Sequence, residues 1–424
     1  MTEQRLPCKT PGCANTIQPA TARRTGGYCG PCAGKIANAA RVEYIRKHRK
    51  DVDLYAGLTD PVDILRIVHQ PRTHDPLVNL LPPPQSIEEL YASLSPHHTT
   101  LLMNAAATEL SQNNTNFAES VAGCLAAFTR FSLDPLLSTF LDKNHFWPSF
   151  AFRDARSSIT SRLIRALDSE EVNHNLALRA LAWIRDPDAV AFVQAAAADP
   201  THRVKNMKAS VDAYTLDAAW EIEAGHQRDL FLSTSLAFTP APDGITDPAL
   251  KLCEELPRPC SWCRRPLVAL LEIDVSDDRF AFLRFPGPRL QLITCDLCAC
   301  FGKHVFAELD DSGYASWSHK NERPRWLPTD PADWQRSPWA GVPLRLKRRS
   351  IFHAVDWLLP TTISQVGGLP AWVQSPSFPG CPRCARTMIF LAQVDNAQFR
   401  TSEGIFYAFF CRECRTTATT YQQS

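Results

Sequence analysis

Twelve of the fifteen cysteines in this 424-residue chain fall into three sets of paired thiols. Two sets have the spacing C-x2-C…C-x2-C, and the first set has C-x4-C…C-x2-C. The sets are Cys8, Cys13, Cys29 and Cys32; Cys260, Cys263, Cys295 and Cys298; and Cys381, Cys384, Cys411 and Cys414. One such pair can place two thiolates on a tetrahedral ion, and the second pair completes the coordination shell. The spacing therefore predicts three Zn²⁺ sites.

We expect all three sites to be structural, because four thiolates leave no coordination position for water or substrate. The alternative is a disulfide scaffold. A start without an apolar signal segment and a long helical middle disfavour that alternative and predict a protein of the reducing cytoplasm. Cys124, Cys253 and Cys300 lie outside the sets. Cys300 could be an alternate ligand, but we expect a small buried residue there.

Composition excludes several classes of function. The 45 Lys and Arg nearly balance the 44 Asp and Glu, so the whole chain is no polycation that coats nucleic acid. No window approaches 18 uninterrupted apolar residues, so no membrane partner is expected. The P-loop, H-E-x-x-H and G-x-S-x-G motifs do not occur in the sequence, and no other catalytic constellation is recognisable. We therefore predict that the protein is not an enzyme.

Residues 1–50 are predicted to form a zinc module of the treble-clef or short-ribbon type, because the second cysteine pair runs directly into a helical stretch. The module contains ten Lys and Arg and two Glu, a net charge of +8. Its basic run at residues 46–50 could contact phosphates or an acidic protein face. A solvated helix end is at least as good an interpretation, so nucleic acid is an alternative partner and not the favoured one.

Residues 51–235 are predicted to be helical. Ser86 and Glu89 have the spacing of a capping box, and four Asp-Pro pairs mark helix starts. These pairs begin at Asp60, Asp134, Asp186 and Asp199. A helix, an Asp-Pro turn and a second helix at residues 172–198 resemble a HEAT-like repeat, which would stack into a solenoid. An irregular bundle is the alternative, and the sequence does not decide between them.

Residues 236–259 are Pro-rich and are predicted to be a linker. From residue 260 onwards the sequence favours short strands, and it contains an internal repeat. In both copies an apolar strand follows the first cysteine pair and ends at an Asp, Asp274 or Asp395, eleven residues after the second cysteine. A second strand then leads into the next pair. Residues 260–424 are thus predicted to be a duplicated zinc ribbon, and the whole chain an α+β protein with a zinc module, a solenoid-like middle and this β domain.

The second copy carries a recognisable signature. It consists of ISQVGGLPAWVQ at residues 363–374, the cysteine pair at 379–384, and the strands at 388–395 and 403–411. The signature resembles the bacterial YwqG-like family and, more weakly, the C-terminal region of the programmed cell death 2 family. The first resemblance implies no catalytic residues and a kinship with immunity proteins that neutralise toxins. The second implies protein binding and assistance to a ribosomal protein.

Two features of the signature have a physical interpretation of their own. Gly367 and Gly368 permit positive φ angles or a tight turn. Trp372 would pack into the core or, less favourably, form an apolar ledge for a ligand. The functional expectation is a non-catalytic cytoplasmic protein-binding protein, most specifically an immunity protein that occludes a bacterial toxin or effector. The alternative is a chaperone-like zinc-ribbon factor associated with nucleic acid or the ribosome.

Overall fold

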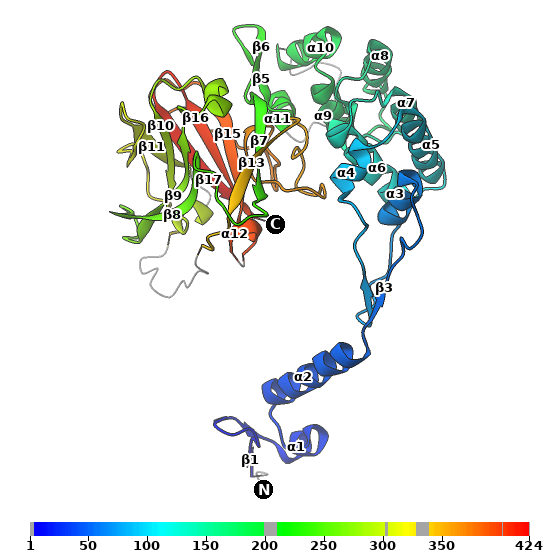
Figure 1. Ribbon diagram of the computed structural model, residues 1–424, viewed down its shortest axis with the longest axis vertical. Helices are drawn as coiled ribbons and strands as arrows, with labels where there is room; N and C mark the ends of the chain where they lie inside the picture. Colours follow the sequence, from blue (N-terminus) through cyan, green and yellow to red (C-terminus); the bar gives the residue numbers. More distant parts are fainter. Residues whose placement is uncertain (1–3, 199–209, 302–303, 328–338, 401, 424) are drawn as a thin grey trace. The chain divides into compact units, whose positions relative to one another are not determined.

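The computed structural model describes residues 4–198, 210–301, 304–327, 339–400 and 402–423 (Figure 1). The chain divides into two compact units, Met1–Gln85 and Ser86–Ser424. Both helices and sheets are present, so the chain is an α+β protein, as predicted.

The first unit contains a small core at its cysteine cluster. Its elements are β1 (Leu6–Pro7), β2 (Thr16–Ile17), α1 (Pro19–Thr25), α2 (Gly30–His48), β3 (Lys50–Val52), α3 (Pro61–His69) and β4 (Val78–Leu80). Strands β1 and β2 pair antiparallel, and β3 and β4 pair parallel. Cys8, Ile17 and Cys29 are buried together. None of the 19 residues of α2 is buried, so this helix contributes almost nothing to the core.

The second unit begins with helices whose starts follow local sequence signals. They are α4 (Ile87–Ala92), α5 (Pro96–Ser111), α6 (Thr115–Phe128), α7 (Asp134–Asp142), the 3₁₀ helix η1 (Ser149–Phe152), α8 (Ser157–Ala166), α9 (His174–Ile184), α10 (Pro187–Ala198) and α11 (Val211–Asp217). The capping box is formed, since the Glu89 N–H donates to Ser86 Oγ at 3.2 Å. Asp186 accepts from the Ala189 N–H at 2.8 Å at the start of α10. The Asp199-Pro200 pair lies outside the described residues.

The helices vary widely in length and burial. Helix α4 has 6 residues and α5 has 16, whereas α6 is the most buried, with ten of its residues in the interior. Helices of such different length and burial fit an irregular bundle around α6 as well as they fit a regular repeat. The region is helical, and its HEAT-like character stays a prediction.

Two sheets and one hairpin complete the second unit. The strands are β5 (Trp220–Glu223), β6 (His226–Asp229), β7 (Leu232–Pro240), β8 (Leu250–Pro259), β9 (Pro266–Asp274), β10 (Arg289–Thr294), β11 (Val305–Leu309), β12 (Ala315–Trp317), β13 (Leu344–Arg349), β14 (Gln365–Gly368), β15 (Ile389–Asp395), β16 (Ile405–Cys411) and β17 (Thr416–Gln422). Short helices η2 (Asp278–Leu283), η3 (Cys298–Phe301) and α12 (Asn396–Phe399) interrupt them.

The larger sheet has the order β12-β11-β17-β16-β15-β14-β7-β13, and the smaller has β10-β9-β8. One hydrophobic core joins them: it includes Leu271 and Leu292 of the smaller sheet and Val394 and Phe406 of the larger. Both cysteine ribbons therefore belong to one β structure. The two hairpins lie together as expected, but the sheets also include β7 and β8, which precede the predicted start of this domain at residue 260.

The segment predicted to be a linker is instead part of the sheets. Residues 236–259 contain the second half of β7 and all of β8, and Leu236, Phe238 and Leu250 are buried. Strand β7 lies between β14 and β13, near one edge of the larger sheet. The prolines misled the sequence analysis, because Pro240 and Pro259 fall at strand ends, where a missing N–H is tolerated. The helices and sheets also form one unit, and strands already begin at Trp220.

Candidate metal centres and an aromatic pocket

The structure assembles each of the three predicted cysteine sets. In each set the four sulfur atoms lie within 4.8 Å of one another. The Sγ–Sγ distance is 3.8 Å for Cys13 and Cys29, 3.4 Å for Cys263 and Cys295, and 3.7 Å for Cys384 and Cys411. Metal–sulfur bonds of about 2.3 Å in a tetrahedron would give about 3.8 Å. All fifteen cysteines are free thiols, so no disulfide scaffold forms, and each cluster could bind a metal ion.

The first cluster combines a hairpin with the start of α2. Cys29 is the N-cap of this helix, and Cys32 lies in its first turn. The free N–H groups and the dipole at a helix start stabilise a thiolate, and the pKa of Cys29 is lowered by its hydrogen bonds with Asn15 and the Cys32 backbone. The Cys29 N–H donates to Cys8 Sγ at 3.3 Å. Backbone N–H groups of Cys29 and Thr10 lower the pKa of Cys8 to about 6, which favours the thiolate needed by a metal ion.

The second and third clusters contain the same local turn. In one, the Cys260 N–H donates to the Arg265 carbonyl at 2.7 Å, and in the other the Cys381 N–H donates to the Arg386 carbonyl at 2.8 Å. The residue after each second cysteine, Arg264 or Ala385, has a positive φ angle, 65° and 62°. The first pair then leads into β9 or β15, which pairs antiparallel with β10 or β16. This likeness supports the internal repeat.

The three remaining cysteines lie outside the clusters. Burial raises the pKa of Cys124 in α6 to about 12 and also raises the pKa of Cys253 in β8. Cys300 is half-buried, and its Sγ lies 3.4 Å from the Asp296 carbonyl oxygen. None of the three thiols is grouped with the candidate ligands. Cys300 is therefore not grouped with the ligands, but it is half-buried and not buried as expected.

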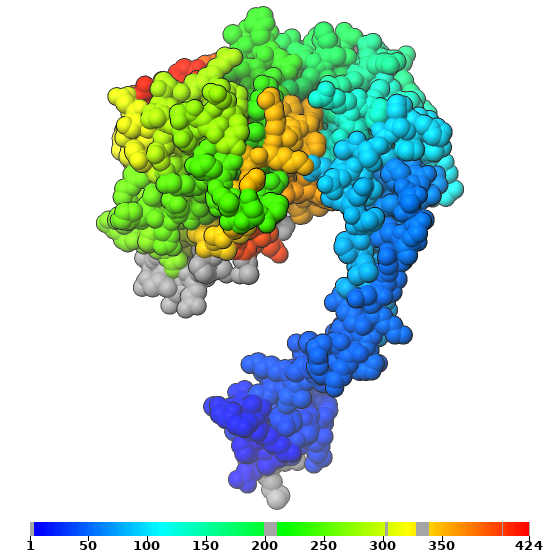
Figure 2. All heavy atoms as spheres, viewed as in Figure 1, coloured from blue at the N-terminus to red at the C-terminus, as the bar shows by residue number. Residues whose placement is uncertain are grey.

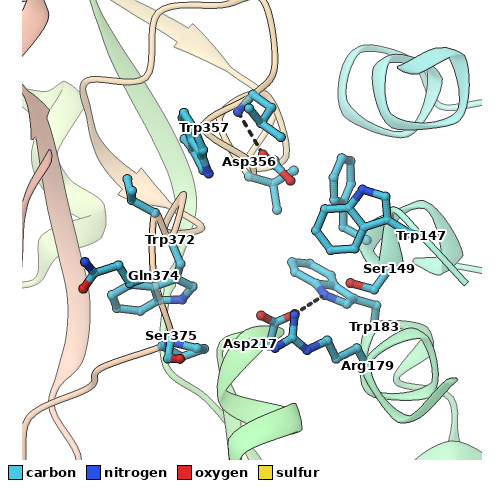
Figure 3. A pocket seen from close by; sticks show the side chains of 15 residues that line it. Trp147, Ser149, Arg179, Trp183, Asp217, Asp356, Trp357, Trp372, Gln374 and Ser375 are labelled. Atoms are coloured by element: carbon cyan, nitrogen blue, oxygen red, sulfur yellow. Dashed lines mark hydrogen bonds between the residues drawn. The ribbon is translucent and has the colours of Figure 1, made fainter. Parts of the chain in front are cut away.

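A cavity that the sequence analysis did not find lies within the second unit, and we call it the aromatic pocket. Its volume is about 290 Å³. Four tryptophans line it: Trp147, Trp183, Trp357 and Trp372. The polar lining residues are Ser149, Arg179, Asp217, Asp356, Gln374 and Ser375 (Figure 3).

The pocket lies where the helices meet loops of the sheet region. The segment that contributes Trp357 and Trp372 lies between the helices and the sheets, in orange in Figure 2. Hydrogen bonds connect this segment to the helices: Thr361 Oγ1 donates to Glu88 at 3.0 Å. Since the lining comes from segments far apart in the chain, no local motif could have revealed it.

The pocket disfavours the ionised form of its two carboxyl groups, Asp217 and Asp356. Burial raises the pKa of Asp217, although Arg179 opposes the shift and the Trp183 Nε1–H donates to this carboxylate at 3.3 Å. Burial also raises the pKa of Asp356, and the charge of Asp217 raises it further. The Leu358 N–H donates to Asp356 at 2.9 Å.

Trp372 was expected either to pack into the core or to form an apolar ledge for a ligand, and it has features of both. Its ring is half-buried and stacks on Tyr407, with ring centroids 4.8 Å apart. The same side chain lines the aromatic pocket. Its Nε1–H is buried and has no hydrogen-bond acceptor among the described residues.

Comparison with known proteins gives one full-length relative. The uncharacterized protein YpfL of Salmonella typhimurium is 35% identical over 430 residues, with 100% of both chains covered. The chain belongs to the YpfL family. No family model matches it, and no solved structure does. The resemblance of residues 260–424 to the YwqG-like and programmed cell death 2 families therefore stays a prediction.

Among the described residues, no helix is both long enough and apolar enough to cross a bilayer. The longest, α2, carries basic side chains at its C-terminal end.

Proposed function

We propose that this protein is a cytoplasmic, non-catalytic binding protein stabilised by three zinc ions, and that its partner is a protein. Most specifically, it would be an immunity protein that binds and occludes a bacterial toxin or effector. The observation that carries the proposal is the donor set of each cluster: four cysteine sulfurs within 4.8 Å. Four thiolates make a closed zinc shell, which stabilises a fold and activates no water.

The surface of the second unit adds support. Trp357 and Leu358 are adjacent at the aromatic pocket and are 39% and 64% exposed. Exposed tryptophans are frequent anchors in protein interfaces. Inhibition by occlusion requires a complementary surface with a few such anchors and no chemistry from the inhibitor. A zinc-stabilised surface would also lose less conformational entropy on binding.

The metal part of the proposal predicts three zinc equivalents per chain. Protein purified without added metal should contain close to three equivalents by elemental analysis and should be colourless. The absence of visible absorption would separate zinc from iron, which four thiolates can also bind. A zinc content near zero, or stoichiometric iron, would contradict this prediction.

The partner is tested by co-expression. A toxic protein encoded beside this gene should be tolerated only when this chain is also made, and the two should purify together. Leu358→Asp should weaken protection, because it places a charge in an apolar contact. Ile245→Asp is the matched control, since Ile245 lies outside the pocket and is similarly exposed at 63%. Toxicity that persists with full expression of the wild-type chain would refute the immunity function.

A second candidate, the nucleic-acid- or ribosome-associated factor, is favoured by one observation. Helix α2 buries none of its residues and carries exposed basic side chains, in a 50-residue module with a net charge of +8. Arg46 and Lys47 are partly neutralised by Glu43, at 2.7 and 3.3 Å. The same purification separates the candidates. Bound nucleic acid that dissociates at high salt, without a toxic partner, would favour the second.

A further inference from the structure

The aromatic pocket has the features of a small-ligand site. Its volume of about 290 Å³ is just below the range for such sites, which begins at about 300 Å³, so the site suits a small ligand. Trp147 and Trp183 reach it from the helices, and Trp357 and Trp372 from the opposite side (Figure 3). Trp183 is only 5% exposed, so its position is fixed by packing. An indole attracts a cation that lies over the face of its ring, and four indoles line this cavity.

The charges of the lining favour a positive ligand. Asp217 and Asp356 are opposed by one cation, Arg179, among the lining residues. Burial disfavours the ionised form of both carboxyl groups, and their mutual repulsion adds to the effect at Asp356. A cation in the cavity would offset the cost of keeping two carboxylates out of water.

One polar group also lacks a partner. The Trp372 Nε1–H is buried and donates to no acceptor among the described residues. A buried donor without an acceptor is unfavourable, so a ligand oxygen at this position would contribute to binding. The exposed side chain of Ser375 lies on the same loop and offers a further polar contact, whereas the Gln374 amide donates to the Gln423 carbonyl at 2.7 Å.

We propose that the aromatic pocket binds a small organic cation that carries an oxygen acceptor, of the quaternary ammonium class. The cationic group lies among the four indoles and near Asp217 and Asp356, and the oxygen accepts from Trp372. The site shares Trp357 with the surface proposed to bind a toxin, but its ligand is a free small molecule, so the titration below requires no toxin and its outcome is separate from that of the co-expression test.

The test is calorimetric titration of the full-length, zinc-loaded chain with choline chloride, with sodium chloride added to keep ionic strength constant. Choline should bind saturably. The neutral molecule of the same shape is 3,3-dimethylbutan-1-ol. Its affinity should be lower than that of choline by a factor of about ten or more, since it lacks the charge. Equal binding of the two, or no saturable binding of choline, would overturn the proposal. Saturable binding of cellobiose without choline binding would identify a sugar site instead.

Variants place the binding in the pocket. Trp357→Ala should weaken choline binding about tenfold, whereas Trp326→Ala should not change it, because Trp326 is 82% exposed and does not line the pocket. Asp356→Asn should also weaken it, while its side-chain oxygen can still accept from the Leu358 N–H. Unchanged thermal unfolding would show that both pocket variants are folded. If folded Trp357→Ala and Asp356→Asn bind choline as the wild type does, the assignment of the pocket is wrong.

Discussion

Replacing Cys411 by serine is expected to destabilise the second unit by about 4 kcal/mol or more, because it would remove one ligand of the proposed structural zinc ion. Cys411 is the last residue of β16 and is 5% exposed, with its Sγ 3.7 Å from that of Cys384. Strand β16 lies inside the larger sheet, between β15 and β17. Loss of the ion should therefore loosen the middle of the sheet, and the zinc content should fall from three equivalents to two.

Cys124→Ser is the matched control. Cys124 is equally buried, at 2% exposure, but it belongs to α6 and to no cluster. The serine hydroxyl replaces a buried thiol that has the Tyr91 side chain as its hydrogen-bond partner, so the change should cost at most about 1–2 kcal/mol and leave three zinc ions bound. Denaturant unfolding and zinc analysis of both variants measure the difference. A Cys411→Ser protein that keeps three zinc ions would show that this thiol is not a ligand.

Gly367→Ala should destabilise the second unit by at least about 3 kcal/mol, from backbone strain and a steric clash together. Gly367 has a φ angle of +72°, which residues with a Cβ rarely adopt. An added Cβ would lie 2.0 Å from the Thr234 carbonyl oxygen on β7. Because β14 pairs with β7 on one side and β15 on the other, neither strand can shift without disturbing the sheet.

Gly244→Ala separates the two causes. Gly244 has nearly the same φ angle, +71°, but nothing lies within 4 Å of the added Cβ. Only the conformational strain remains, so the loss should be about 1 kcal/mol. Thermal unfolding of the two variants gives the comparison. Equal losses would mean that the close approach of β14 to β7 does not constrain residue 367.

Local signals in the sequence predicted local structure well. The spacing of Cys381 and Cys384 predicted a turn that brings two thiols together, because such a turn involves only neighbouring residues. The capping box at Ser86 and the helix start at Pro187 are likewise decided within one turn of helix. The positive φ angles of Gly367 and Gly368 confirm what the glycine pair allowed.

Other features depend on partners far away in the chain. Residues 236–259 look like a linker because of their prolines, yet β7 pairs with β13 and β14, which lie more than a hundred residues further on. Strand pairing over such separations leaves little trace in local composition. The sequence alone could not place this segment in a sheet.

The sequence by itself determined the twelve candidate metal ligands, the α+β class and the repeat of the ribbon, because ligand spacing and turn chemistry are properties of short segments. Only the tertiary structure decided that strands of both ribbons contribute to one core, while Cys381 and Cys411 pack in a second one, and that helices and sheets form one unit. The aromatic pocket also exists only in the tertiary structure, which brings together residues from separate segments, among them Trp147, Asp217, Asp356 and Trp372. Burial and charge repulsion, which shift the pKa values of these carboxyl groups, exist only after folding has removed them from water.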